Sequence, residues 1–248
     1  MKEDFHPDRH TAEICLTVVK AAINNLNAGA KPKTKEFSSN LNQHPDATYL
    51  ALAILIGSWQ DNSQCDLEAI TQQLGIRYDE WLKKAREILH LPDSPLSLNN
   101  GVWKVLHRAE LWDILGSRIL DQNLDTFRSL AVSVLKEPDP AFELPPEKRY
   151  AANIYEKVLK CSHVLRKGIA EGLAILGSQP KACANCSQGK AEATCILVIR
   201  ELLTDADWVL WGSLNALLPT LAEAAPDEFL DAVEKAMCLT PCPFDERG

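Results

Sequence analysis

From Arg108 to the end of the chain, apolar residues recur at the three-to-four-residue spacing of amphipathic helices, without an alternating strand pattern between them. Helices are predicted in pairs over 108–121 with 123–136, 147–161 with 163–177, and 191–204 with 206–223, and another begins at Pro226. The pairs start roughly 35 to 45 residues apart, which is the period of HEAT-like or armadillo-like repeats. No residue pattern repeats from one pair to the next. Helix number and spacing therefore predict a short α-solenoid of HEAT-like paired helices.

The part of the chain before Arg108 follows a different order of elements. An apolar helix is predicted over 46–59. Ser63 can cap a second helix that ends at Gly75. Asp79 can cap a third helix, which a following proline stops. Three short helices are therefore expected in close succession.

A β-hairpin is predicted directly after these helices. Leu96 and Leu98 alternate with polar residues, and the Asn-Asn-Gly sequence at 99–101 tolerates the positive φ angles of a tight turn. A β-prone pattern resumes over 102–106. Three helices followed by a hairpin is the order of a winged-helix domain, in which the second and third helices form the helix-turn-helix.

The predicted fold class is thus predominantly all-α, with one winged-helix-like segment that contains a β-hairpin. Residues 1–45 are expected to form an N-terminal helix, over 11–28, and a linker that is rich in polar residues. Residues 46–107 form the winged-helix-like domain, and residues 108–248 form the helical-repeat domain.

Charge and the N-terminal sequence limit where the protein acts and what it binds. The formal net charge is −8 and the pI about 5.3, which disfavours nonspecific binding to nucleic acid or anionic lipid. Residues 1–7 lack the features of a secretory signal. The longest apolar run, 49–57, is about half of the roughly 20 residues that cross a bilayer. We therefore expect a cytoplasmic protein without membrane contact, whose eight cysteines are free thiols.

The third predicted helix carries the candidate nucleic-acid-binding residues. Lys83, Arg86 and His90 fall at helical spacing, opposite the apolar stripe, where they could contact phosphates. Acidic residues share the same helix, and Glu80 and Lys84 form an ordinary i, i+4 pair. A structural or protein-binding winged helix is therefore favoured over one that binds DNA.

One close pair of cysteines is the weak candidate for a metal or redox site. Cys183 and Cys186 have the spacing of a zinc knuckle or a redox motif. A closed zinc site needs four ligands, and no second C-x-x-C follows. The favoured interpretation is a plain loop with free thiols, without a bound metal.

Two further features concern packing and recognition. Gly168 and Gly172 stand one helical turn apart in an apolar helix, and this spacing typically lets two helices approach closely. Trp208 and Trp211 are the candidate partner-binding residues, because tryptophans are enriched at the centres of interfaces. Burial in the core is the default expectation for the six tryptophans, which lie mainly on the inward stripes of the predicted helices.

Sequence motifs for catalysis were sought without success. The chain has no phosphate-binding G-x-x-x-x-G-K-[ST], no dinucleotide-binding glycine motif, no H-E-x-x-H and no nucleophile elbow. We therefore expect no enzyme activity and no cofactor.

Short sequence motifs give the chain a resemblance to a known class of protein. They are Ile54–Trp59, Leu91–Pro95, Val102–Val105, Leu111-Trp112 and Val164–Gly168. Together they resemble a region of very large bacterial proteins of the STAND NTPase kind, in which an ATPase is followed by a winged-helix element and helical repeats. Several members of that class act in defence against phages. The resemblance implies a connector and sensor region without the ATPase.

These observations lead to two expectations of function. The first is a non-catalytic protein-interaction, sensor or scaffold module that binds a protein partner and serves a bacterial defence or signalling assembly. The alternative is a DNA-binding winged-helix regulator, in which Lys83, Arg86 and His90 approach the duplex.

Overall fold

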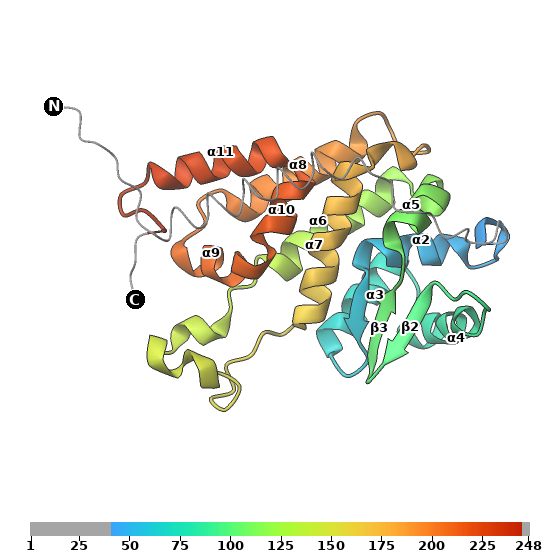
Figure 1. Cartoon of the computed structure of the whole chain (residues 1–248), viewed down its shortest axis with the longest axis horizontal. Helices are drawn as coiled ribbons and strands as arrows, with labels where there is room; N and C mark the ends of the chain where they lie inside the picture. Colours follow the sequence, from blue (N-terminus) through green and yellow to red (C-terminus); the bar gives the residue numbers. More distant parts are fainter. Residues whose placement is uncertain (1–40, 245–248) are drawn as a thin grey trace.

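The computed structural model describes residues 41–244, and they fold into a predominantly helical protein with one small sheet (Figure 1). The predicted fold class is confirmed at this level. Within the described part of the chain, helices are too short or too polar to cross a membrane. The helix predicted over 11–28 lies outside the described residues.

Before Arg108 the order of elements is helix, strand, two helices and two strands. They are α2 (Ala47–Ile56), β1 (Ser58–Gln60), α3 (Gln64–Leu74), α4 (Tyr78–Leu89), β2 (Leu96–Asn99) and β3 (Val102–Val105), preceded by the short η1 (Leu41–Gln43). Ser63 accepts a hydrogen bond from the backbone N–H of Asp66, and Gly75 ends α3 in the left-handed conformation, as predicted. The prediction that Asp79 caps the next helix is wrong. Helix α4 begins at Tyr78, and extended backbone at Arg77 precedes it.

The predicted hairpin is present, and a third strand joins it. Asn100 and Gly101 adopt the positive φ angles that the turn between β2 and β3 requires. Strand β1 pairs antiparallel with β3, so the sheet order is β1-β3-β2. The rings of Trp59 and Trp103 stack across this pair with centroids 5.9 Å apart, and both side chains are buried. Cross-strand aromatic pairs of this kind stabilise short sheets.

From Arg108 onward all regular elements of the described chain are helical. They are α5 (Arg108–Leu115), η2 (Gly116–Arg118), α6 (Asp121–Leu135), η3 (Pro140–Glu143), η4 (Pro146–Ala151), α7 (His163–Ser178), η5 (Pro180–Ala182), α8 (Lys190–Leu203), α9 (Trp208–Leu214), η6 (Asn215–Leu217), α10 (Leu218–Ala224) and α11 (Pro226–Met237).

Four of the predicted helices are not formed as expected. The helix predicted over 46–59 ends at Ile56, where strand β1 follows, and the helix predicted over 108–121 ends at Leu115. The helix predicted over 147–161 is reduced to the 3-10 helix η4 and a series of turns. Its large apolar side chains, Tyr150, Ile154, Tyr155 and Val158, are exposed, and a short helix without a buried face is marginal in water. The helix predicted over 206–223 is divided into α9, η6 and α10. Pro219 explains the division, because proline has no N–H to donate within a continuing helix.

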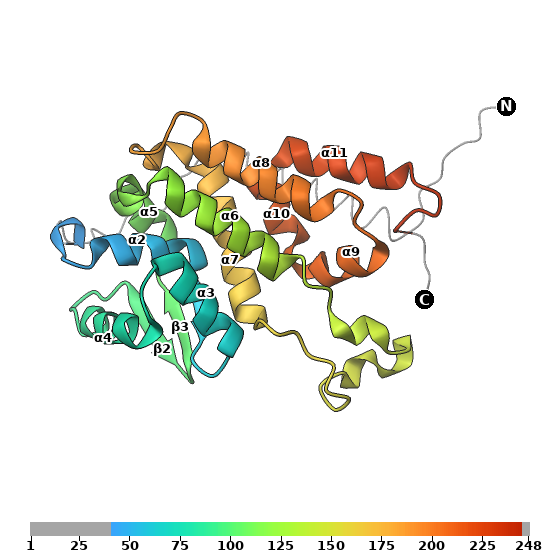
Figure 2. The ribbon, with the colours of Figure 1, turned by 180° about the vertical axis from the view of Figure 1, so that it is seen from behind.

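Helix α7 lies at the centre of the molecule (Figures 1 and 2). It packs against α2 and β1 on one side and against α8 and α10 on the other. Side chains added at Gly168 and Gly172 would collide with the backbone oxygens of Ile56 and Leu55. Close packing at these glycines is therefore confirmed, and the buried side chains on both sides of α7 form one continuous core.

Two buried arginines complete this core. Arg108 donates to the carbonyl oxygens of Ile54, Leu55 and Gly168, at 2.5 to 3.3 Å, and its guanidinium lies 3.1 Å from the Glu171 carboxylate. The last carbonyls of an α-helix have no partner within the helix. Arg108 supplies donors to those of α2, deep inside the protein.

Arg166 does the same for the end of α6. Its guanidinium donates to Val134 and Glu137 carbonyls at 2.6 and 3.2 Å, and to Leu135 at 3.4 Å. A fourth contact, at 3.5 Å, reaches Ser213 at the end of α9. Arg166 is 2% exposed, so water cannot replace these donors.

Replacing Arg108 with methionine should lower the free energy of unfolding by at least about 3 kcal/mol, because several buried carbonyls lose their donors. Urea denaturation followed by circular dichroism measures this loss. Arg128→Met is the control, since Arg128 forms an exposed pair with Glu201 and should cost less than about 1 kcal/mol. Equal losses in the two variants would contradict the role given to Arg108.

Candidate functional site

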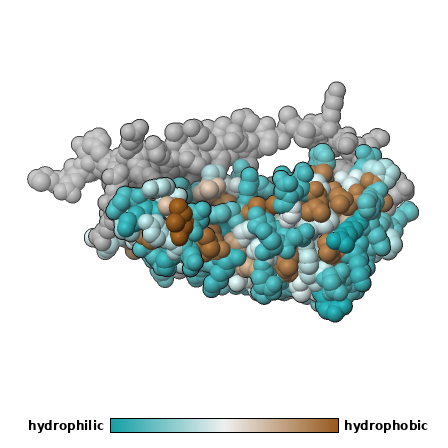
Figure 3. All heavy atoms as spheres, turned by 90° about the horizontal axis from the view of Figure 1, so that it is seen from below, coloured by the Kyte–Doolittle hydropathy of each residue, from teal (hydrophilic) through white to brown (hydrophobic). Residues whose placement is uncertain are grey.

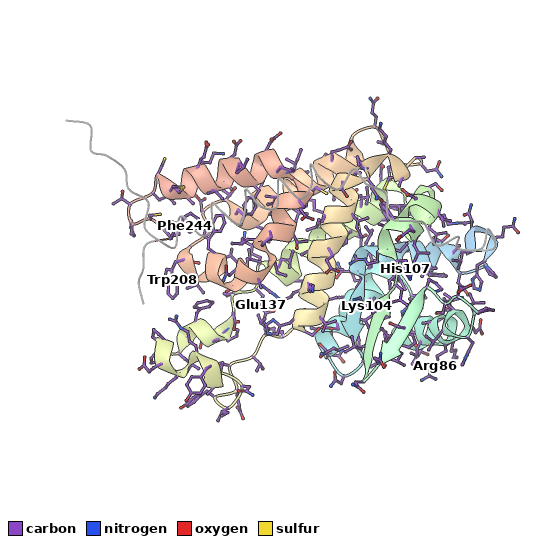
Figure 4. All side chains as sticks on the ribbon, viewed as in Figure 1. Arg86, Lys104, His107, Glu137, Trp208 and Phe244 are labelled. Atoms are coloured by element: carbon purple, nitrogen blue, oxygen red, sulfur yellow. A yellow bond between two sulfur atoms is a disulfide. The ribbon has the colours of Figure 1, made fainter. Side chains whose placement is uncertain are left out.

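The exposed face of α4 carries the predicted nucleic-acid-binding residues. Lys83, Arg86 and His90 are all exposed, on the side of the helix away from the buried Trp81 and Ile88. Arg86 points outward at the edge of the molecule (Figure 4). The helical spacing therefore brings the three side chains onto one accessible face.

The charge on α4 is mixed rather than uniformly positive. Asp79, Glu80 and Glu87 are also exposed on this helix. Lys84 turns back towards the body, where its Nζ lies 2.7 Å from the Asp46 carboxylate. Lys83 and Arg86 consequently share their helix with three carboxylates, which weakens any attraction to phosphates.

Cys183 and Cys186 lie in the loop between α7 and α8. Cys183 is buried, and burial raises the pKa of its thiol to about 12. The Cys186 thiol donates to the Ile119 carbonyl at 3.4 Å, and burial raises its pKa too. Burial therefore disfavours the thiolate form of both side chains, which is the reactive form in thiol–disulfide exchange.

Hydrogen bonds around these cysteines fasten the loop to the start of α6. Asn185 donates to the Ser117 carbonyl at 2.6 Å, and Ser187 donates through its N–H and hydroxyl to Asp121, at 2.8 and 2.5 Å. Among residues 41–244, no three His, Cys, Asp or Glu side chains gather as they would around a metal ion. These hydrogen bonds hold the loop before α8 against the start of α6.

These pKa shifts predict the order in which the free cysteines react. At pH 8 a thiol with a pKa of about 12 is ionised in roughly one molecule in ten thousand, so Cys183 and the buried Cys195 should resist alkylation. The exposed Cys238 should react first. Mass spectrometry of an iodoacetamide time course measures the order. Fast labelling of Cys183 would instead reveal an activated thiol.

Not all cysteines are free, contrary to the expectation from composition. Cys65 in the first turn of α3 and Cys161 just before α7 form a disulfide, with Cα atoms 5.0 Å apart. They are separated by 96 positions in the sequence. Only the fold brings them together, because α3 and α7 both pack against β1.

The two candidate partner-binding tryptophans occupy different environments. Trp211 is buried, with its ring edge-on to Phe229 and Phe244 at 6.3 and 4.9 Å, and it offers no surface to a partner. Trp208 is partly exposed. Its ring meets Phe142 edge-on at 5.5 Å, and the Arg149 guanidinium lies 5.7 Å from its centre.

Phe142 and Arg149 belong to a segment that projects from the body between α6 and α7, which we call the lobe (residues 137–161; Figures 1 and 2). Four large apolar side chains of the lobe are exposed: Tyr150 (90%), Ile154 (76%), Val158 (58%) and Tyr155 (47%). Apolar residues gather in several places on this side of the molecule (Figure 3). Exposed large apolar side chains that gather on one segment mark a candidate site of interaction.

The exposure of these apolar side chains is not expected from the sequence. They were assigned to a helix over 147–161, in which they would be buried. The signal that could have revealed them is the run of prolines before Glu147.

One hydrogen bond joins the base of the lobe to the body, and another joins the two ends of the lobe to each other. The N–H of Asp139 donates to the Ser213 hydroxyl at 2.7 Å, and the N–H of Lys160 donates to the Glu137 carboxylate at 3.0 Å. Phe142 rests on Trp208, as described above. In Figure 4, Glu137 lies at the root of the lobe and Trp208 faces it.

A separate cleft of about 570 Å³ opens between the end of β3, α7 and α10. Lys104, His107 and Glu171 line it together with Glu223, whose pKa burial raises. Arg108 is also in its wall, but carbonyls and Glu171 already satisfy that guanidinium. Charges of both signs meet here without selecting one class of ligand.

Comparison with known proteins adds no relative. No protein-family model matches the sequence, and neither curated proteins nor solved structures give a match. A function has therefore to be inferred from the chain's own surfaces.

Proposed function

We propose that this chain is a non-catalytic protein-interaction module that binds a protein partner through the lobe. The observation that carries the proposal is the exposure of Tyr150, Ile154, Tyr155 and Val158 on one projecting segment. Burying an exposed side chain of this size contributes about 1.5 to 3 kcal/mol. Tyrosine is also among the residues enriched where protein interfaces bind most tightly.

The anchoring of the lobe supports this proposal. Contacts of Asp139 and Phe142 at one end, and of Cys161 and Ser162 at the other, hold the segment before any partner arrives. A surface that is ordered beforehand loses less conformational entropy on binding. Trp208 adds a partly exposed aromatic ring beside the lobe.

We further propose a winged-helix-like unit in residues 46–107. The order α2-β1-α3-α4-β2-β3 and the sheet order β1-β3-β2 support it. For the HEAT-like array, the packing of α6 on α8 and of α8 on α11 is supportive. The contact of α7 with α2 and β1 is not expected of repeats that touch only their neighbours.

The resemblance to the STAND class suggests the setting in which such a module works. We propose that the chain acts as a sensor or scaffold part of a bacterial defence or signalling assembly. The ATPase of such an assembly would reside on another chain or segment, because the present sequence has no phosphate-binding loop.

A double variant of the lobe tests the proposed function. Tyr150→Ser with Ile154→Ser should reduce recovery of the partner from a lysate of the source cells at least about tenfold, because each hot-spot side chain contributes more than about 1 kcal/mol. Quantitative mass spectrometry of pull-downs measures recovery. Leu230→Ser on α11, where the leucine is 45% exposed, is the matched control and should retain the partner. Equal recovery with both variants would refute binding through the lobe.

A DNA-binding regulator is the second candidate, because α4 would be the recognition helix of a winged-helix unit and presents Lys83, Arg86 and His90 on one face. The three carboxylates on α4 and the net charge of −8 oppose this function.

We expect no saturable binding of duplex DNA even at about 50 mM salt, where phosphate contacts are strongest. Fluorescence anisotropy with a labelled duplex measures it. Saturable binding that disappears in Lys83→Ala with Arg86→Ala would establish the second candidate instead.

A further inference from the structure

The Cys65–Cys161 disulfide joins two helix starts at the base of the lobe. Cys65 lies in the first turn of α3, and Cys161 precedes Ser162, the N-cap of α7. The lobe ends at Cys161. The disulfide is therefore the covalent anchor of its C-terminal end.

A noncovalent clasp lies directly beside the disulfide. The Asp66 carboxylate is fully buried and accepts hydrogen bonds from the N–H and hydroxyl of Ser162, at 2.9 and 2.5 Å. It also accepts from the Gln60 N–H at 2.9 Å and the Ser63 hydroxyl at 2.8 Å. These bonds do not need the disulfide, so α7 stays docked when the disulfide opens.

Of the two cysteines, Cys65 is partly exposed. A cleft of about 570 Å³ is lined by Cys65 and by residues of the lobe, Leu159 and Lys160 among them. Cys161 itself is buried. An attacking thiolate would thus enter through this cleft and meet the Sγ atom of Cys65.

The position of both cysteines at helix N-termini favours exchange. The partial positive charge at the start of a helix stabilises a thiolate, and a stabilised thiolate is a good leaving group. The Asp66 carboxylate opposes this effect, although four hydrogen bonds already disperse its charge. Lys160 and Glu68 also line the cleft, and their opposite charges offset each other there.

We propose that Cys65–Cys161 is a reversible thiol–disulfide exchange site, and that its oxidation state sets how firmly the lobe is held. The partner in the exchange is a dithiol reductant, or its disulfide in the reverse direction. The inference rests on the proposed function, because it concerns the regulation of the same lobe.

The exchange balances as a two-electron step. One thiolate of the dithiol attacks Cys65 Sγ, the bond to Cys161 breaks, and Cys161 leaves as a thiolate that takes up a proton. The second thiol of the reductant, after losing its proton, attacks the mixed disulfide and releases Cys65 as a thiolate, which is then protonated. The protein disulfide is reduced to two thiols and the dithiol is oxidised to a disulfide.

Opening the disulfide should loosen a defined part of the chain. Residues 152–160 run between the contact of Arg149 with Trp208 and the disulfide. Without the disulfide, their C-terminal end is held by noncovalent contacts alone. These are the hydrogen bond from Lys160 to Glu137 and the hydrogen bonds from Ser162 to Asp66. The exposed Ile154, Tyr155 and Val158 lie within this segment, so reduction changes how the apolar surface is presented.

Hydrogen exchange of the full chain tests this inference. Dithiothreitol should speed exchange of the amides over 152–160 at least about tenfold in the wild type, while those of α8 stay unchanged. Cys65→Ser with Cys161→Ser should exchange rapidly with and without reductant, and Cys238→Ser should behave like the wild type. Unchanged exchange over 152–160 on reduction, or two free thiols in protein purified without reductant, would overturn the inference.

The experiment also separates this inference from the proposed function. Hydrogen exchange over 152–160 could be the same with and without dithiothreitol while Tyr150→Ser with Ile154→Ser still loses the partner. The thiol–disulfide exchange site is then refuted, and partner binding by the lobe stands. Hydrogen exchange over 152–160 could instead respond to dithiothreitol while that variant keeps its partner. The thiol–disulfide exchange site is then supported, and the proposed function is refuted.

Discussion

The fold depends on how helix ends are satisfied inside its core. Helices α2 and α6 both end away from water, where unpaired carbonyls are costly. Arg108 and Arg166 supply the missing donors, one to each end. A guanidinium suits this task because it offers five N–H groups in a fixed plane and stays charged. Arg108 also donates to the Gly168 carbonyl and so joins α2 to α7. Arg166 is itself a residue of α7.

This arrangement makes α7 the central helix against which the other parts of the molecule pack. The helix can approach α2 and β1 closely because Gly168 and Gly172 leave room for backbone. On its other side it packs against α10 and α8. The lobe begins where Arg166 of α7 donates to the Glu137 carbonyl, and it ends next to Ser162, the N-cap of α7. The projecting segment is thereby fixed at both of its ends.

Local signals in the sequence were sufficient where neighbouring residues decide the structure. Ser63 and Gly75 bound α3, and Asn100 with Gly101 forms the hairpin turn, because caps and tight turns depend on a few adjacent residues. The exposed face of α4 followed from helical spacing in the same way.

Features that depend on distant contacts escaped sequence analysis. Strand β1 is three residues long and exists through its pairing with β3. The disulfide joins Cys65 to Cys161 across 96 positions, and nothing near either residue marks the pair. The apolar spacing over 147–161 was typical of a helix, but a helix also needs a surface on which to bury that face. The same missing surface leaves the lobe exposed and available to a partner.

Magnitudes decide between the two surfaces on which function could reside. On α4, Lys83 and Arg86 can neutralise few phosphates, whereas proteins that owe their affinity to the DNA backbone make about 6 to 10 such contacts. On the lobe, burial of Tyr150, Ile154 and Val158 contributes about 1.5 to 3 kcal/mol for each side chain. The entropy of ordering that surface has already been lost on folding, since the lobe is anchored in the free protein. The lobe is therefore the surface with more binding free energy to offer, and a redox change at its base acts on that part of the molecule.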